Sequence, residues 1–140
     1  MNTLRKVVIP AAGLGIRMQP ATKVISKEML PLAGKPIIQH ILDEIYYAGF
    51  EEIIFVSHSK KPILIDYLNL SKISKERLQV GHYEEIEKLS KLKISYVKQA
   101  GAKGLGHAIL CAKKILINEP FAVVLPDMVI DSNLKNNNLL

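Results

Sequence analysis

The chain has 140 residues, 49% of them apolar and 23% charged, which is enough for one globular domain with a buried core. Its formal charge of +6 favours anionic partners, but the lysines are dispersed and no aromatic base-stacking motif is present, so we expect no nucleic-acid partner. The single cysteine, Cys111, excludes an internal disulfide, and we interpret it as a buried, inert thiol. No apolar run reaches the roughly 18 residues of a membrane span, so we predict a cytoplasmic protein without a membrane partner.

Four short apolar runs rich in β-branched residues predict buried strands. In chain order they are residues 7–11, 52–57, 93–97 and 121–125. Apolar residues at helical spacing predict helices over 36–49, 59–68 and 104–116, with one or two exposed helices between 70 and 92. This order predicts an α/β fold, a Rossmann-like, mostly parallel sheet with helices on both faces. We assign the domain to residues 1–131 and a polar tail to residues 132–140.

The first predicted strand runs into a glycine-containing loop, and ligands of parallel sheets bind beyond such strand ends. The loop, residues 11–17, reads Ala-Ala-Gly-Leu-Gly-Ile-Arg. Its glycines let backbone N–H groups approach phosphate oxygens, and Arg17 adds a planar donor fork. Met18 stands where a dinucleotide-binding fingerprint needs a third glycine, and no P-loop is present. On these residues alone, an ordinary strand–helix turn is the better interpretation.

Polar residues also follow the third and fourth predicted strands. The Gln99 amide suits the edge of a base that Gly104 lets approach closely; the alternative is an exposed glutamine before a glycine-rich helix start. His107, taken alone, is a structural histidine. Asp127 ends the run Leu-Pro-Asp, where a carboxylate facing bound phosphates is a natural ligand for Mg²⁺. Asp131 is interpreted as a turn or capping residue.

Three motifs together resemble one family. They are the GxGxR loop with Lys-Glu-Met-Leu-Pro-Leu at 27–32 and Gly-Lys-Pro at 34–36, the segment Lys-Gly-Leu-Gly-His-Ala at 103–108, and Leu-Pro-Asp at 125–127. The pattern resembles the sugar-1-phosphate nucleotidyltransferases, and Ala-Thr-Lys at 21–23 is similar to the bacterial UTP–glucose-1-phosphate uridylyltransferases in particular. The resemblance covers most of residues 7–131 and is loose between 66 and 93.

The resemblance implies the N-terminal, nucleotide-binding portion of a C-terminally truncated nucleotide-diphospho-sugar transferase fold. The implied reaction converts UTP and glucose 1-phosphate into UDP-glucose and pyrophosphate, with Mg²⁺ held by Asp127. Arg17 and Lys27 would stabilise developing charge. The implied nucleotide-binding residues are Ala11, Ala12, Gly13, Leu14, Gly15, Glu28, Gln99 and Gly104. A surface charge is an open alternative for Glu28.

Two departures from the family pattern keep other functions open. Ile16 stands where the family usually has Thr, and the family's sugar-contacting residues and second metal-binding Asp would follow residue 140. We therefore expect a fragment, a truncated product or a degenerate relative, and a catalytically silent partner of a full-length homologue is an alternative function. A dinucleotide-binding oxidoreductase is a third hypothesis, which Met18 argues against. Because family members commonly self-associate, a homo-oligomer is also left open.

Overall fold

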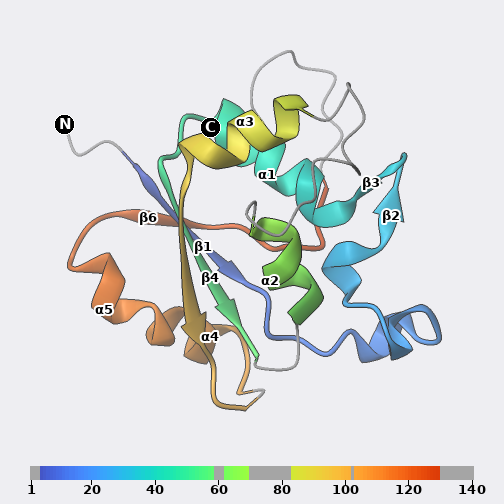
Figure 1. Cartoon of the computed structure of the whole chain (residues 1–140). Coiled ribbons are helices and arrows are strands. Elements are labelled where there is room, and N and C mark those ends of the chain that lie inside the picture. The colour runs from blue at the N-terminus through green and yellow to red at the C-terminus, as the bar shows by residue number, and fades with distance from the viewer. Residues whose placement is uncertain (1–3, 59–61, 70–82, 102, 130–140) are drawn as a thin grey trace.

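The computed structural model describes residues 4–58, 62–69, 83–101 and 103–129, and its centre is a four-stranded sheet (Figure 1). The strands are β1 (Lys6–Pro10), β4 (Glu52–Ser57), β5 (Lys93–Lys98) and β6 (Phe121–Val123). They lie in the order β5-β4-β1-β6, and every neighbouring pair is parallel. The predicted α/β architecture with a parallel sheet is therefore confirmed.

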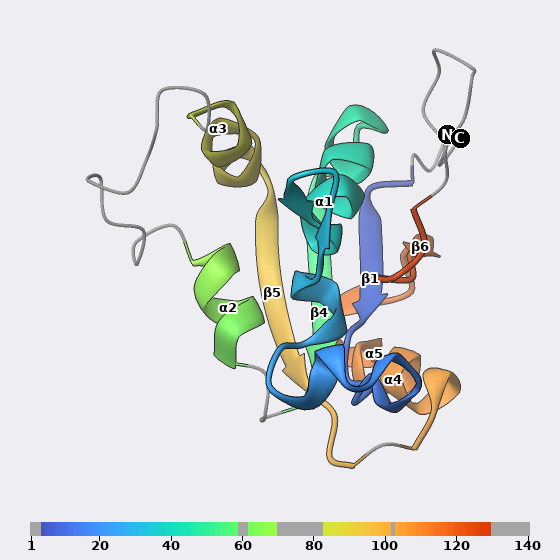
Figure 2. The same cartoon turned by 90° about the vertical axis from the view of Figure 1, so that its right-hand side faces the viewer.

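Helices cover both faces of this sheet, as Figure 2 shows. One side carries α1 (Ile37–Tyr47), α2 (Pro62–Leu68) and α3 (Tyr83–Lys91), and the other carries α4 (Leu105–Cys111) and α5 (Lys113–Leu116). Successive strand residues point to opposite faces, so Val7 and Ile9 pack in the α1 core while Val8 packs against α4 and α5. Burial on both faces explains the continuous apolar runs in the sequence. None of the described helices has the length and apolar character that crossing a membrane requires.

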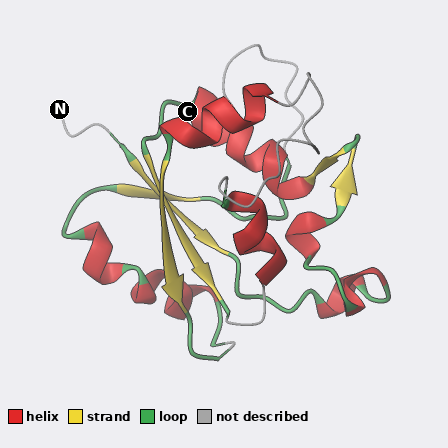
Figure 3. Cartoon of the chain, viewed as in Figure 1, coloured by secondary structure: helices red, strands yellow, loops and turns green. Residues whose placement is uncertain are grey.

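Between β1 and α1 the chain forms short elements that the sequence did not predict (Figure 3). Three single 3₁₀ turns, η1 (Ile16–Met18), η2 (Ala21–Lys23) and η3 (Lys27–Met29), precede a two-stranded hairpin of β2 (Pro31–Leu32) and β3 (Lys35–Pro36). The hairpin turns at Ala33 and Gly34, both with positive φ, as tight two-residue hairpin loops require.

Several predicted boundaries differ from the structure. The helix predicted over residues 104–116 breaks at Ala112 into α4 and α5, and β6 ends at Val123, two residues before the predicted end. Cys111 is half-buried rather than buried. The predicted helix start at Ser59, most of the predicted helical region between 70 and 92, and the predicted tail lie outside the described residues.

The order of the strands creates a switch point beside β1. The chain passes from β1 to β4 and β5 on one side, and then returns to β6 on the other side of β1. The segments that follow β1 and β6 therefore leave neighbouring strand ends at this switch point, which is where ligands of such sheets bind.

We predict that Ile54→Ala lowers the free energy of unfolding by about 2–5 kcal/mol, because Ile54 is fully buried in β4 and its truncation leaves a cavity. Chemical denaturation measures the change. Ile63→Ala, the same truncation at a side chain that is 47% exposed on α2, is the control and should change stability by less than about 1 kcal/mol. Equal losses in the two variants would contradict the assignment of the core.

Candidate functional site

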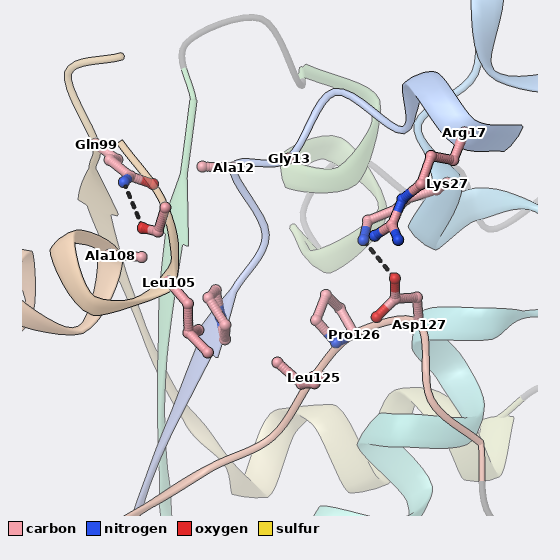
Figure 4. A pocket seen from close by; sticks show the side chains of 12 residues that line it. Ala12, Gly13, Arg17, Lys27, Gln99, Leu105, Ala108, Leu125, Pro126 and Asp127 are labelled. Atoms are coloured by element: carbon pink, nitrogen blue, oxygen red, sulfur yellow. Dashed lines mark hydrogen bonds and ion pairs between the residues drawn. The ribbon is translucent and has the colours of Figure 1, made fainter. Parts of the chain in front are cut away.

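A cavity of about 420 Å³ lies at the carboxyl ends of the strands, beside the switch point (Figure 4). Segments that follow β1, β5 and β6 line it, although they are far apart in the sequence. The predicted site residues on its wall are Ala12, Gly13, Arg17, Lys27, Gln99, Gly104 and Asp127. Leu14 and Gly15 line an adjoining hollow that shares Gly13, Arg17, Lys27 and Asp127 with it. Ala11, by contrast, is fully buried in the core under the loop.

The loop after β1 is held by backbone geometry. The Ala11 N–H donates to the Val56 carbonyl at 2.8 Å, which continues the β1–β4 ladder to the start of the loop. Gly15 has φ of 67°, and the Thr22 hydroxyl donates to its carbonyl at 2.6 Å. A Cβ on Gly15 would lie 3.1 Å from Thr22 Cγ2, so this position excludes larger residues. No pattern in the sequence identifies Thr22 as a residue that shapes the loop, although it lies in the family-like Ala-Thr-Lys stretch.

An ion pair joins the two charged walls of the cavity. Lys27 Nζ lies 2.5 Å from Asp127 Oδ2, with side chains 16% and 32% exposed. Lys27 begins η3, which is anchored because Met29 packs against the core and the Leu30 carbonyl accepts from the Ile37 N–H at 3.0 Å. Arg17 points into the same part of the cavity, so two cations and one carboxylate lie there (Figure 4). This excess of positive charge suits a polyanion such as a triphosphate.

At the other end of the cavity, the Gln99 side chain is only 2% exposed, so the alternative of an exposed glutamine is wrong. Its backbone N–H donates to the Ser57 carbonyl at 2.9 Å, one residue beyond the β4–β5 ladder. Its amide nitrogen donates to the Gly104 carbonyl at 3.2 Å and lies 2.9 Å from Nδ1 of His107. Gly104 has φ of 87° and precedes α4, so the turn from β5 into α4 brings these groups together.

Glu28 occupies a different environment from the other predicted residues. It is fully buried within η3 and does not line the cavity, so it is not a surface charge. Its contact with a base or ribose stays a prediction. This burial cannot be predicted from the sequence, because a single turn without apolar periodicity carries no pattern that distinguishes buried from exposed positions.

The donor set fits a magnesium ion that arrives with a nucleotide. No group of three or more His, Cys, Asp or Glu side chains that could hold a metal occurs in the part of the chain that the structure describes. Asp127 places one carboxylate on the cavity wall, and Mg²⁺ is commonly bound by one or two carboxylates together with substrate phosphates. Asp131 lies outside the described residues.

The fold is a parallel α/β sheet with a cavity at its switch point, lined by a glycine loop, two cations and a carboxylate. Residues 6–137 match the family model described as Nucleotidyl transferase, and the chain belongs to this family. This membership replaces the oxidoreductase hypothesis.

Curated relatives within this family are similar to the chain over almost its whole length. The chain is 44% identical to the UTP–glucose-1-phosphate uridylyltransferase of Haemophilus ducreyi over 96% of its own length, and 43% identical to that of Escherichia coli K12 over 99%. It covers 48% and 49% of these two proteins, so it spans about half the length of the curated relatives it matches.

Solved structures of similar proteins have the same fold as this chain. A UDP-glucose pyrophosphorylase complexed with UDP-glucose superimposes with a TM-score of 0.85 at 39% identity, over 98% of this chain and 51% of that one. A UTP-bound UGPase from Acinetobacter baumannii gives a TM-score of 0.76 at 34% identity, over 94% of this chain and 48% of that one.

We predict that Gly15→Ala destabilises the protein more than Gly34→Ala does. Both glycines have positive φ, which costs a non-glycine residue about 1–2 kcal/mol, but only Gly15 has neighbouring atoms within 4 Å of an added Cβ. Comparing the two variants by chemical denaturation separates backbone strain from the clash with Thr22. Equal destabilisation would show that the loop accommodates a side chain at Gly15.

Proposed function

We propose that this chain binds UTP in the cavity and contributes to transfer of its uridylyl group to glucose 1-phosphate, yielding UDP-glucose and pyrophosphate. The observation that supports the proposal is the convergence of a glycine loop, two cations, a carboxylate and a buried amide on one cavity at the switch point. The names of the similar proteins, UTP–glucose-1-phosphate uridylyltransferase and UDP-glucose pyrophosphorylase, support it independently.

The two ends of the cavity take different parts of the nucleotide in this proposal. The uracil ring lies against Gln99 and Gly104, and the triphosphate lies along the loop at Gly13 toward Arg17 and Lys27. Backbone N–H groups of the loop donate to phosphate oxygens, and the two cations neutralise charge that develops during transfer.

The reaction asks for positioning and charge stabilisation rather than for a protein nucleophile. A phosphate oxygen of glucose 1-phosphate attacks the α-phosphorus of UTP in line, a new P–O bond forms, and the bond to the β-phosphate breaks with its electrons leaving on pyrophosphate. Arg17 and Lys27 stabilise the negative charge on the transferring and leaving groups. When bound, Mg²⁺ supplies further charge neutralisation and orients the triphosphate.

In this proposal Lys27 and Asp127 have two states, one in which they pair with each other and one in which each pairs with a bound ligand. Without nucleotide, the ammonium and the carboxylate neutralise each other. Asp127 would hold a metal ion only after releasing Lys27, and Lys27 would then pair with the triphosphate. Metal and nucleotide are therefore expected to bind cooperatively. A metal ion at Asp127 would release Lys27 for the triphosphate, and a triphosphate at Lys27 would release Asp127 for the metal ion.

A second candidate function is nucleotide binding without turnover, as a partner of a full-length homologue. The observation that favours it is Ile16, whose exposed apolar side chain lines the hollow beside the glycine loop and offers phosphate no hydrogen bond. It shares the nucleotide site with the first candidate and differs only in the chemistry that follows.

We predict that UTP binds in the presence of Mg²⁺ and that Asp127→Asn weakens binding about 10–100-fold, because the change removes a charged interaction without changing side-chain size. Isothermal titration with and without Mg²⁺ measures the change. The control is Asp66→Asn, the same substitution at an exposed position of α2, outside the cavity, which should leave the affinity unchanged. Absence of UTP binding, or equal affinity in Asp127→Asn, would overturn the proposed site.

Pyrophosphate release separates the two candidate functions. We expect the 140-residue chain, given UTP, glucose 1-phosphate and Mg²⁺, to release pyrophosphate at a rate that Asp127→Asn strongly reduces. Mg²⁺-dependent UTP binding without release, in a folded chain, would instead favour the binding partner. Measuring both on the same preparation distinguishes a failed site from a missing catalytic step.

A further inference from the structure

Both N–H groups of the Gln99 side-chain amide are engaged by acceptors within the protein. One N–H donates to the Gly104 carbonyl at 3.2 Å, and the nitrogen lies 2.9 Å from Nδ1 of His107. Its oxygen accepts no hydrogen bond from the described residues, and it lies on the side turned toward Ala12 in Figure 4. The amide therefore offers the cavity an acceptor and no donor.

Two groups, the Gly104 carbonyl and His107 Nδ1, hold the amide in this orientation. A carbonyl oxygen can only accept, so the group that faces it must be the NH₂ of Gln99. The second hydrogen of that NH₂ then points to His107, whose Nδ1 must carry a lone pair, which places the ring proton on Nε2. Cys111 Sγ lies 3.9 Å from the same Nδ1, so a weak S–H donor faces the same lone pair.

We propose that His107 is a positioning residue for base recognition, which holds the Gln99 amide so that only its oxygen faces the base. Resting on the proposed function, this predicts selection of a base with an N3–H donor, as in uracil, over cytosine, whose N3 is an acceptor. Flipping the amide would present its donors to cytosine, but it would turn the oxygen toward the Gly104 carbonyl and the Nδ1 lone pair. Two lost hydrogen bonds and two facing acceptors oppose the flip.

Two substitutions separate positioning from simple packing. In His107→Leu the ring acceptor is lost and one Gln99 N–H has no partner, so the ratio of UTP to CTP affinity should fall about tenfold. His107→Asn is the matched variant, because Oδ1 of Asn occupies the place of Nδ1 and can accept the same hydrogen bond; it should retain the preference. Titration of each variant with UTP and with CTP, at one Mg²⁺ concentration, measures the ratio.

An unchanged ratio in His107→Leu, with UTP still bound, would overturn the positioning role and leave the proposed function intact. Failure of the wild-type chain to bind either nucleotide would overturn both. Nitrogen-15 NMR of the nucleotide-free chain tests the geometry independently: we expect the Nε2–H tautomer of His107, together with slowly exchanging Gln99 amide protons that His107→Leu releases. An Nδ1–H tautomer would overturn the positioning role whatever the affinities are.

Discussion

The hydrogen bonding of β1 on both sides is the constraint on which the rest of the structure depends. In parallel register, Val8 lies opposite Ile54 of β4 and opposite Val123 of β6, so β6 ends two residues before β1, whose pairing with β4 continues to Pro10. The carboxyl ends of these strands cannot be covered by one continuous stretch of chain, because the chain passes from β1 to β4 on one side of β1 and later returns to β6 on the other side. The cavity is the consequence, and every residue that lines it except Pro10 lies outside the strands.

The ion pair between Lys27 and Asp127 connects the two segments that leave β1 and β6. Lys27 and Asp127 are separated by 100 positions in the sequence, yet they form one contact across the cavity. The three 3₁₀ turns make this contact possible by carrying the chain from the β1 loop to η3, which rests on the core through Met29. A shift of η3 would therefore move Lys27 and weaken the phosphate end of the site without touching the sheet.

The sequence predicted the elements whose burial leaves a pattern. Val7 and Ile53 lie in strands buried on both faces, and such strands produce apolar runs that are visible without a structure. The break at Ala112 was not predictable, because the apolar spacing of α4 continues into α5. Glu28 shows the same limit at the site: its residue type suggests solvent, and only the packing of η3 buries it.

For the candidate site, motif order predicted which residues line the cavity, but it could not predict the hydrogen-bond and ion-pair partners of those residues. Gln99 and Asp127 were identified from their places after strands, and both line the cavity. Their partners, His107 and Lys27, depend on the path of the loops between strands, which no local pattern encodes. Resemblance to a family supplied the pairing of these segments, and geometry supplied the contacts.

The two ends of the cavity differ in how they respond to solvent. The end at Lys27 and Asp127, which we propose holds the phosphates, consists of partly exposed charges, whose attraction for a polyanion is weakened by salt. The end at Gln99, which we propose holds the base, consists of a buried amide that contacts the Gly104 carbonyl and His107, and ionic strength affects such hydrogen bonds little. In the proposed binding mode, affinity and base preference therefore have separate physical origins. A change in salt should alter how tightly a nucleotide is held, while leaving the choice between uracil and cytosine to the orientation of a single amide.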